Sequence, residues 1–222
     1  DGRAVWTGHR LELETRLHDL RPQRLDSRAP AMTVGGPLRL RLDGLPSPDP
    51  GARAAPPPWS LAGQLELEGR AEGAPRPVTV RAEGSAKAGA LELRQLQVRS
   101  GDAQAVLRIA LARSANREWT LASEGSLADF DPVPWWPGDA ASPLQQGPHR
   151  LNAGWQLEVR APADAARLAP LALLQRLAGT GRLRLHDSVL AGVPVEGVAT
   201  LGYNAAGGAN PGSLRADLQL GG

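Results

Sequence analysis

Apolar and charged residues alternate with a period of two in many short segments of this chain. An aliphatic residue, mostly Leu or Val, occupies every second position, and a polar residue, mostly Arg, Glu or Gln, stands between them, at residues 38–42, 65–68, 78–81, 183–185 and 214–220. Successive side chains of a β-strand point to opposite faces of its sheet, so each segment places its aliphatic side chains on one face and its charges on the other. The pattern predicts an all-β fold.

Glycines and prolines divide these segments into a series of strands. We expect one or two strands around a break at Gly8, a strand at 37–43, a meander over 59–124, a strand near 151–160 and three closing strands over 181–220. The strands of the meander are expected to be separated by Gly69, Gly73, Gly84, Gly89 and Gly101. Short connections between sequential strands favour antiparallel pairing. The expected fold class is therefore an elongated, mainly antiparallel, one-sided sheet curled into a groove. A closed β-sandwich, in which two apolar faces pack on each other, fits the same alternation, and the choice stays open.

Three segments interrupt the strands. A proline-rich stretch at 44–58 predicts a long exposed loop, and a second proline-rich interruption covers 131–148. Between strands in the last third, Asp164 suits a helix N-cap, and leucines follow it at spacings of three. This pattern predicts one short helix over 164–177, which covers an end or edge of the sheet.

A short motif occurs twice. Leu-His-Asp-Leu-Arg-Pro at 17–22 and Leu-Ala-Asp-Phe-Asp-Pro at 127–132 each follow a strand, with an apolar pair, an Asp suited to a turn and a Pro that ends pairing. The two copies suggest a repeated unit and allow two sub-units, 1–126 and 127–222. Because the chain begins and ends in mid-pattern, we expect it to be a fragment of a longer β-groove protein.

Composition excludes several classes of function. The 25 basic and 23 acidic residues are interspersed without a basic stripe, which argues against nucleic-acid binding. The absence of cysteine rules out disulfides, thiolate metal sites and cysteine nucleophiles. The four histidines are isolated in sequence, so no metal site is predicted. No uncharged apolar run approaches the roughly 18 to 20 residues of a membrane-spanning helix.

Four other features could carry chemistry, and each has a simpler interpretation. The segment 186–188 holds the His, Asp and Ser of a triad, but adjacent strand residues point to opposite faces. Asp129 and Asp131 suit a turn before a proline. The Gly-Thr-Gly at 179–181 is interpreted as a helix C-cap leading into a strand. The Trp pair at 135–136 either contacts a ligand or plugs an end of the apolar face. We expect no cofactor and no enzymatic activity.

A family resemblance adds to these expectations. The leucine alternation, the repeated Leu-x-Asp-Leu/Phe-x-Pro motif and the closing segment 181–197 are similar to the periplasmic repeats of TamB and the wider AsmA-like proteins. The resemblance implies an elongated β-groove, called a β-taco, in the periplasm, with an inner-membrane anchor outside this segment. It also implies phospholipid transport to the outer membrane, or protein assembly there with an Omp85-type, TamA-like partner. The family has no catalytic residues.

A groove for acyl chains needs an apolar lining, because a lipid tail cannot hydrogen-bond to polar groups buried against it. The leading hypothesis is a non-enzymatic segment that binds phospholipid acyl chains. The alternative is a β-sandwich adhesin-like or scaffold domain that binds protein partners through strand edges. The residues expected to line the groove share one parity within each strand: Leu65, Leu67, Val78, Val80, Leu91, Leu93, Leu107, Ile109, Leu111, Trp155, Leu157, Leu183 and Leu185.

Overall fold

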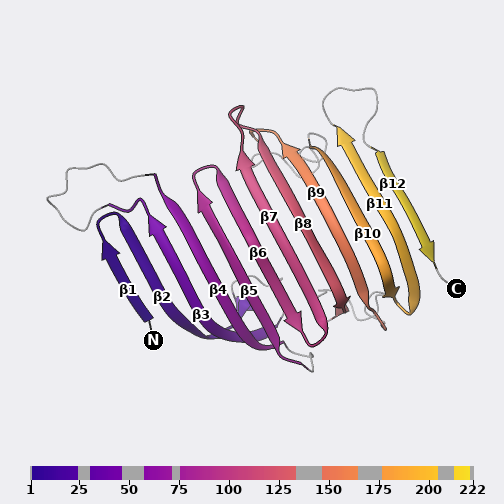
Figure 1. Ribbon diagram of the computed structural model, residues 1–222, viewed down its shortest axis with the longest axis horizontal. Helices are drawn as coiled ribbons and strands as arrows, with labels where there is room; N and C mark the ends of the chain where they lie inside the picture. The colour runs from indigo at the N-terminus through magenta and orange to yellow at the C-terminus, as the bar shows by residue number, and fades with distance from the viewer. Residues whose placement is uncertain are drawn as a thin grey trace.

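The computed structural model describes residues 2–24, 31–46, 58–71, 76–133, 147–164, 177–204 and 213–220. Twelve strands form one antiparallel sheet, in which the spatial order of the strands is their order along the chain (Figure 1). The elements are β1 (Gly2–Thr7), β2 (Arg10–Leu20), the 3-10 turn η1 (Pro22–Arg24), β3 (Met32–Asp43), β4 (Ser60–Ala71), β5 (Val78–Lys87), β6 (Ala90–Ser100), β7 (Ala103–Arg113), β8 (Trp119–Phe130), β9 (Leu151–Ala161), β10 (Ala178–Leu190), β11 (Val193–Asn204) and β12 (Ser213–Leu220). The predicted all-β, antiparallel fold class is confirmed.

Tight turns explain why neighbours in sequence are neighbours in the sheet. Gly89 joins β5 to β6 with a φ of 75°, and Gly192 joins β10 to β11 with a φ of 79°. Glycine adopts these left-handed conformations without the steric penalty that a Cβ atom imposes. Two-residue turns of this kind match the twist of an antiparallel pair, so each strand returns directly alongside the one before it.

Several predicted boundaries differ from the observed ones. Gly69 and Gly84, predicted to separate strands, lie inside β4 and β5. Gly69 is required there because a Cβ atom would collide with the carbonyl oxygen of Thr33 in β3. The strand predicted at 37–43 begins five residues earlier, at Met32.

Other expectations fall on parts of the chain that the structure describes incompletely. Most of the predicted helix at 164–177, the middle of the predicted loop at 44–58 and the Trp pair at 135–136 lie outside the described residues. The division suggested between residues 126 and 127 falls within β8, which pairs with β7 and β9 on both sides of it.

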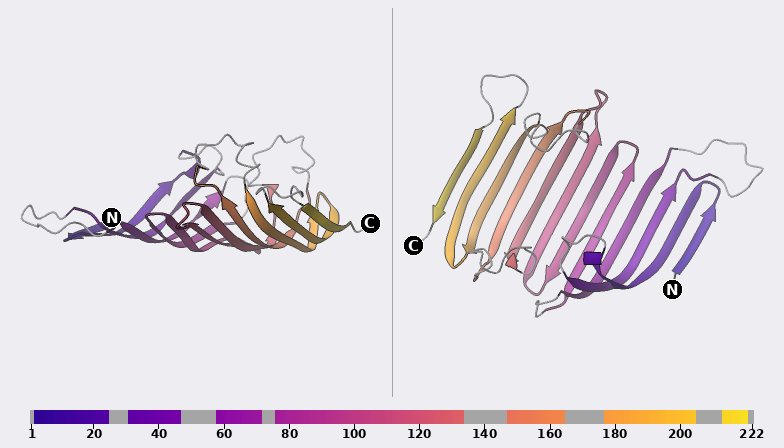
Figure 2. Two further views of the ribbon diagram at one scale, coloured as in Figure 1. Left: turned by 90° about the horizontal axis from the view of Figure 1, so that it is seen from above. Right: turned by 180° about the vertical axis from the view of Figure 1, so that it is seen from behind.

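The sheet is curled rather than flat. We call the strand ends joined by the β2–β3, β4–β5, β6–β7, β8–β9 and β10–β11 connections the lower edge, as oriented in Figure 1, and the opposite ends the upper edge. Seen from behind, η1 and the adjoining ends of β2 and β3 cross in front of neighbouring strands (Figure 2). A small apolar core forms where this edge folds over, built from Met32, Val34, Leu67 and Val78. The described strands form one sheet and not two facing sheets, so the curled groove describes the fold and the sandwich does not.

Three bulges lie at the lower edge, and each contains an Asp in the left-handed conformation. These are Asp19, Asp129 and Asp187, with φ values of 50°, 47° and 44°. In each strand two residues face one residue of a neighbour, as between Leu17 and Leu20 of β2. Asp tolerates this conformation better than most residues, and a bulge bends its strand. The repeated Leu-x-Asp motif therefore corresponds to a bulge.

Candidate functional site

One face of the sheet is apolar because the register aligns the apolar positions of successive strands. Residues directly opposite each other in an antiparallel pair project from the same face. One row of such partners crosses seven strands, from β4 to β10, without a polar side chain. Its members are Leu67, Val80, Val98, Ala105, Leu127, Ala153 and Leu185. We call the face that carries this row the apolar face and the opposite one the charged face.

All thirteen residues predicted to line a groove lie on the apolar face. Pairs such as Leu65 with Ala82, Leu93 with Ile109 and Trp155 with Leu183 connect them across the sheet. Whether they contact lipid stays a prediction. The predicted lining residues do not include the leucines of β2, β3 and β8, which lie on the same face and follow the same alternation. These include Leu11, Leu13, Leu38, Leu40, Leu42, Leu121 and Leu127.

Burial on the apolar face changes along the strands. At the lower edge Val78 is fully buried and Leu67 is 5% exposed, whereas at the upper edge Leu91 is 47% exposed and Trp6 is 49% exposed. The face is therefore covered where the lower edge curls over at β3 to β5, and it is open at the upper edge. At the β10–β11 turn of the lower edge Val193 is 43% exposed, so the cover does not extend along the whole edge. This arrangement resembles a trough whose axis runs across the strands.

A hydrogen-bond network centred on Asn152 in β9 fixes two of the bulges. Its Oδ1 accepts from the backbone N–H of Asp129 at 2.8 Å, and its Nδ2 donates to the carbonyl oxygen of Asp187 at 2.9 Å. The hydroxyl of Ser188, only 2% exposed, accepts from the backbone N–H of Asn152 and lies 2.9 Å from its carbonyl oxygen. Ser188 thus completes the backbone pairing that the β10 bulge interrupts. The segment 186–188, which holds triad residue types, is thus the bulge of β10, and its Ser188 hydroxyl bonds to backbone oxygens.

Trp155 shapes the middle of the apolar face. Its indole lies over Gly125 in β8, where a Cβ atom would collide with the ring. Its Nε1–H donates to the hydroxyl of Ser123 at 3.2 Å. This bond satisfies the polar group of the ring, so Trp155 contributes an apolar surface without an unpaired donor.

The charged face carries ion pairs between adjacent strands. Arg81 bonds to Glu66 at 2.7 Å, and Arg108 bonds to Glu124 at 2.9 Å. Each pair is exposed to water and therefore contributes little to stability. The pairs do keep this face hydrated, which leaves the apolar face as the side able to bury a ligand.

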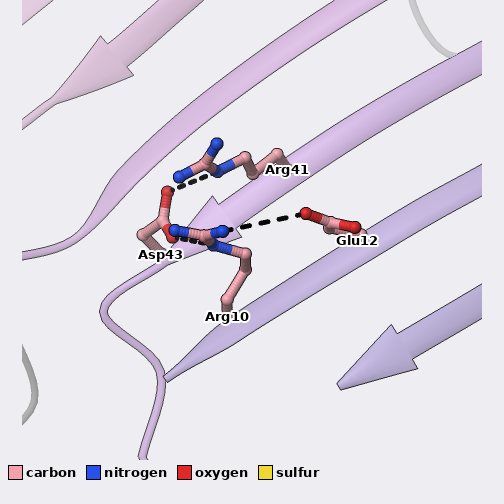
Figure 3. A network of polar contacts seen from close by, with 4 residues as sticks. All are labelled: Arg10, Glu12, Arg41 and Asp43. Carbon is pink, nitrogen blue, oxygen red and sulfur yellow. Dashed lines mark hydrogen bonds and ion pairs between the residues drawn. The ribbon is translucent and has the colours of Figure 1, made fainter. Parts of the chain in front are cut away.

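The most connected charge cluster joins β2 and β3 at the upper edge (Figure 3). Asp43 accepts from Arg10 at 2.7 Å and from Arg41 at 3.0 Å, and Glu12 lies 4.0 Å from Arg10. The hydrogen bond from Arg10 is the main cause that holds the pKa of the Asp43 carboxyl below its usual value. The same bond raises the pKa of Arg10. The network is an exposed ion cluster without a catalytic arrangement.

A depression of about 710 Å³ lies mainly on the charged face. Long side chains such as Arg108, Glu124 and Arg182 surround the small paired residues Ala110 and Ala122 there. The hollow is shallow because it is the space between extended side chains over small ones. We therefore place the candidate site on the apolar face, which needs no enclosed cavity to cover a lipid tail.

The remaining candidate groups have local roles. The Asp131 carboxylate accepts from the backbone N–H of Val133 at 3.0 Å, which is a turn contact as predicted. Residues 179–181 lie within β10 and form no phosphate loop. His9 bonds to the carbonyl oxygen of Leu45, and His149 accepts from the N–H of Ala191.

A metal centre and a membrane-spanning helix are both absent from the described residues. In that part of the chain no three His, Asp or Glu residues lie close enough together to hold a metal ion. Among the same residues no helix has the length and apolar character needed to cross a membrane.

The structure thus presents a curled sheet with one apolar and one charged face. No protein family, curated protein or solved structure matches the chain.

Proposed function

We propose that this chain is a non-enzymatic segment of a lipid-conduit protein, whose apolar face holds the acyl chains of phospholipids. The observation that carries the proposal is the uncharged row from Leu67 to Leu185, which continues across seven strands. An acyl chain forms no hydrogen bonds, so a continuous aliphatic surface is the environment that it requires.

The size of the apolar face supports this reading. Eleven strands, β1 to β11, spaced by about 4.8 Å, span about 50 Å, and strand lengths of about ten residues make the face about 30 Å high. The whole face therefore measures on the order of 1,500 Å², part of which is buried at the lower edge, and a soluble monomer usually exposes apolar patches of only a few hundred Å². Exposed leucines such as Leu91 show that the protein's own described residues leave part of it uncovered.

Free energies of transfer favour movement along such a face. Burying one methylene from water gains about 0.8 kcal/mol, so about ten methylenes laid on the face gain about 8 kcal/mol. A bilayer offers the same tail a similar gain, so exchange between bilayer and groove is close to neutral. A neutral exchange suits a conduit, since tight binding at one position would stop the lipid. In line with the resemblance, we place the parent protein in the periplasm, anchored in the inner membrane and supplying the outer membrane with a TamA-like partner.

Photocrosslinking tests the proposal with matched neighbours in the same strands. A photoreactive amino acid replaces one residue at a time, and the protein is exposed to vesicles of a phospholipid carrying a clickable acyl chain. Capture is expected from the apolar face and not from the adjacent position on the charged face. Equal capture from both faces, or capture from the charged face alone, rejects the proposal. The pairs are Leu93 with Glu92, Leu107 with Arg108, and Leu157 with Gln156.

A charge in the lining tests movement. In the full-length parent protein, Leu107→Arg is expected to block lipid transport while the chain still folds, because a desolvated charge is a barrier to a passing tail. Arg108→Glu is a poor control, since Arg108 pairs with Glu124 and the change would oppose two carboxylates. Arg184→Gln is a better one, because Arg184 makes no ion pair with the described residues. Normal transport by folded Leu107→Arg would contradict a conduit through this segment.

A further inference from the structure

We propose that phospholipids lie on the apolar face in one orientation, with the ends of their acyl chains towards the lower edge and the head-group phosphate at the upper edge, bound by Arg113. The inference rests on the proposed function and adds the orientation of the ligand and a residue that recognises its phosphate.

The shape of the trough sets the direction of the acyl chains. The lower edge folds over and buries Val78 and Val34, whereas Leu91 at the upper edge stays exposed to water. A phospholipid has one apolar and one hydrated end. The buried edge suits the chain ends, because a phosphate placed there would lose its hydration. The open edge leaves the head group in water.

Arg113 places a positive charge where the head group would emerge. The register pairs it with Trp119 and aligns both with Leu111 and Leu121 on the apolar face, at the upper edge. Outside the bulges, Arg113 is the one charged side chain that the register puts on the apolar face in the described strands β1 to β11. Because the pair of Arg113 and Trp119 is the last one of β7 and β8, the charge lies at the boundary between the apolar face and water.

The contacts of Arg113 leave its charge uncompensated. Its guanidinium lies 5.6 Å from the centre of the Trp119 ring, and its Nε points to the carbonyl oxygen of Arg117 at 3.4 Å. It makes no ion pair with a described carboxylate, in contrast to Arg81 and Arg108 on the charged face. A guanidinium held over a ring can still bond a phosphate in a bidentate manner. The Trp ring, apolar with a polar N–H, suits the same boundary.

Two photoreactive phospholipids test the orientation on the full chain. One carries a diazirine at the end of an acyl chain, and the other carries it on the head group. Mass spectrometry of the crosslinked protein is expected to find the chain-end label near Val98 and Leu127 and the head-group label near Arg113. The reverse distribution, or equal labelling of both edges, would overturn the proposed orientation.

Loss of the guanidinium tests the role of Arg113. Arg113→Gln is expected to weaken retention of phospholipid about tenfold, the lower end of the effect of one charge-assisted contact, because the contact lies at the water boundary. Retention of a diacylglycerol with the same chains, which lacks the phosphate, is expected to stay unchanged. Arg184→Gln, on the charged face, serves as the control, and circular dichroism checks the fold of both variants. Unchanged phospholipid retention by Arg113→Gln, or equal losses for both lipids, removes Arg113 from the proposal.

The experiment separates this inference from the function on which it rests. If neither probe labels any apolar-face position in the unmodified chain, lipid binding itself is rejected. If both probes label the apolar face without a preference for an edge, lipid binding stands and the orientation fails.

Discussion

Asn152 offers the sharpest test of how the lower edge is held in shape. Its side chain makes two hydrogen bonds, one to the N–H of Asp129 and one to the carbonyl oxygen of Asp187, and so connects the bulges of β8 and β10. A hydrogen bond contributes about 0.5 to 1.5 kcal/mol net, with exposed bonds at the lower end. Both bonds are exposed, so Asn152→Ala is expected to lower the free energy of unfolding by about 1 to 2 kcal/mol.

Urea unfolding measures this loss, and hydrogen exchange locates it. Gln156→Ala is the matched control, because Gln156 lies on the same strand and the same face and makes none of these bonds; we expect it to cost less than about 0.5 kcal/mol. Asn152→Asp keeps the acceptor for the Asp129 N–H and loses the donor to Asp187. The Asp129 amide should therefore stay protected in Asn152→Asp and exchange faster in Asn152→Ala. If both alanine variants unfold at the same urea concentration, the bridge contributes nothing.

Three further predictions concern single positions. Asp187, at a φ of 44°, should accept Gly with little change, whereas Asp187→Val should cost about 1 to 2 kcal/mol in thermal unfolding; equal melting temperatures would contradict this. Gly125→Leu should displace the Trp155 indole and shift its fluorescence, while Gly154→Ala, whose Cβ would meet only the Gly125 carbonyl oxygen at an ordinary contact distance, should not. The Asp43 carboxyl should show a pKa below 3.8 by NMR, and this pKa should rise in Arg10→Gln. The ion pairs of Asp43 contribute to stability above pH 3.8, and this contribution is lost as the pH falls through the lowered pKa.

The sequence alone was sufficient for the strands and for the apolar face, because both follow from a period of two. The thirteen chosen residues share a face since the register preserves the parity that the alternation shows. The sequence also predicts a break between strands at Gly84, because a single glycine between apolar segments is typical of a turn. Only pairing with β4 and β6 shows that Gly84 continues β5.

The bulges were not predicted because they interrupt the alternation from which strands are recognised. Between Leu185 and Ser188 two residues intervene instead of one, whereas the sequence predicts a regular strand there, with adjacent residues on opposite faces. Its likeness to the motifs at 17–22 and 127–132 is limited to Leu-x-Asp, since no proline follows. The curl was expected in general terms. Its location at the lower edge depends on a buried cluster of residues far apart in the sequence, which includes Met32 and Val78.

The bulges also explain how one face remains apolar over such a long sheet. A shift of one residue in a strand exchanges its two faces. In β6, Leu93 and Leu96 are three residues apart, so a regular strand would point them to opposite sides. The extra residue at Arg94 restores Leu96 to the apolar face, opposite Leu107. In β2, β8 and β10 the same kind of insertion bends the lower edge as well. Continuity of the apolar surface and closure of one side, the two properties that a lipid groove requires, therefore share one local origin.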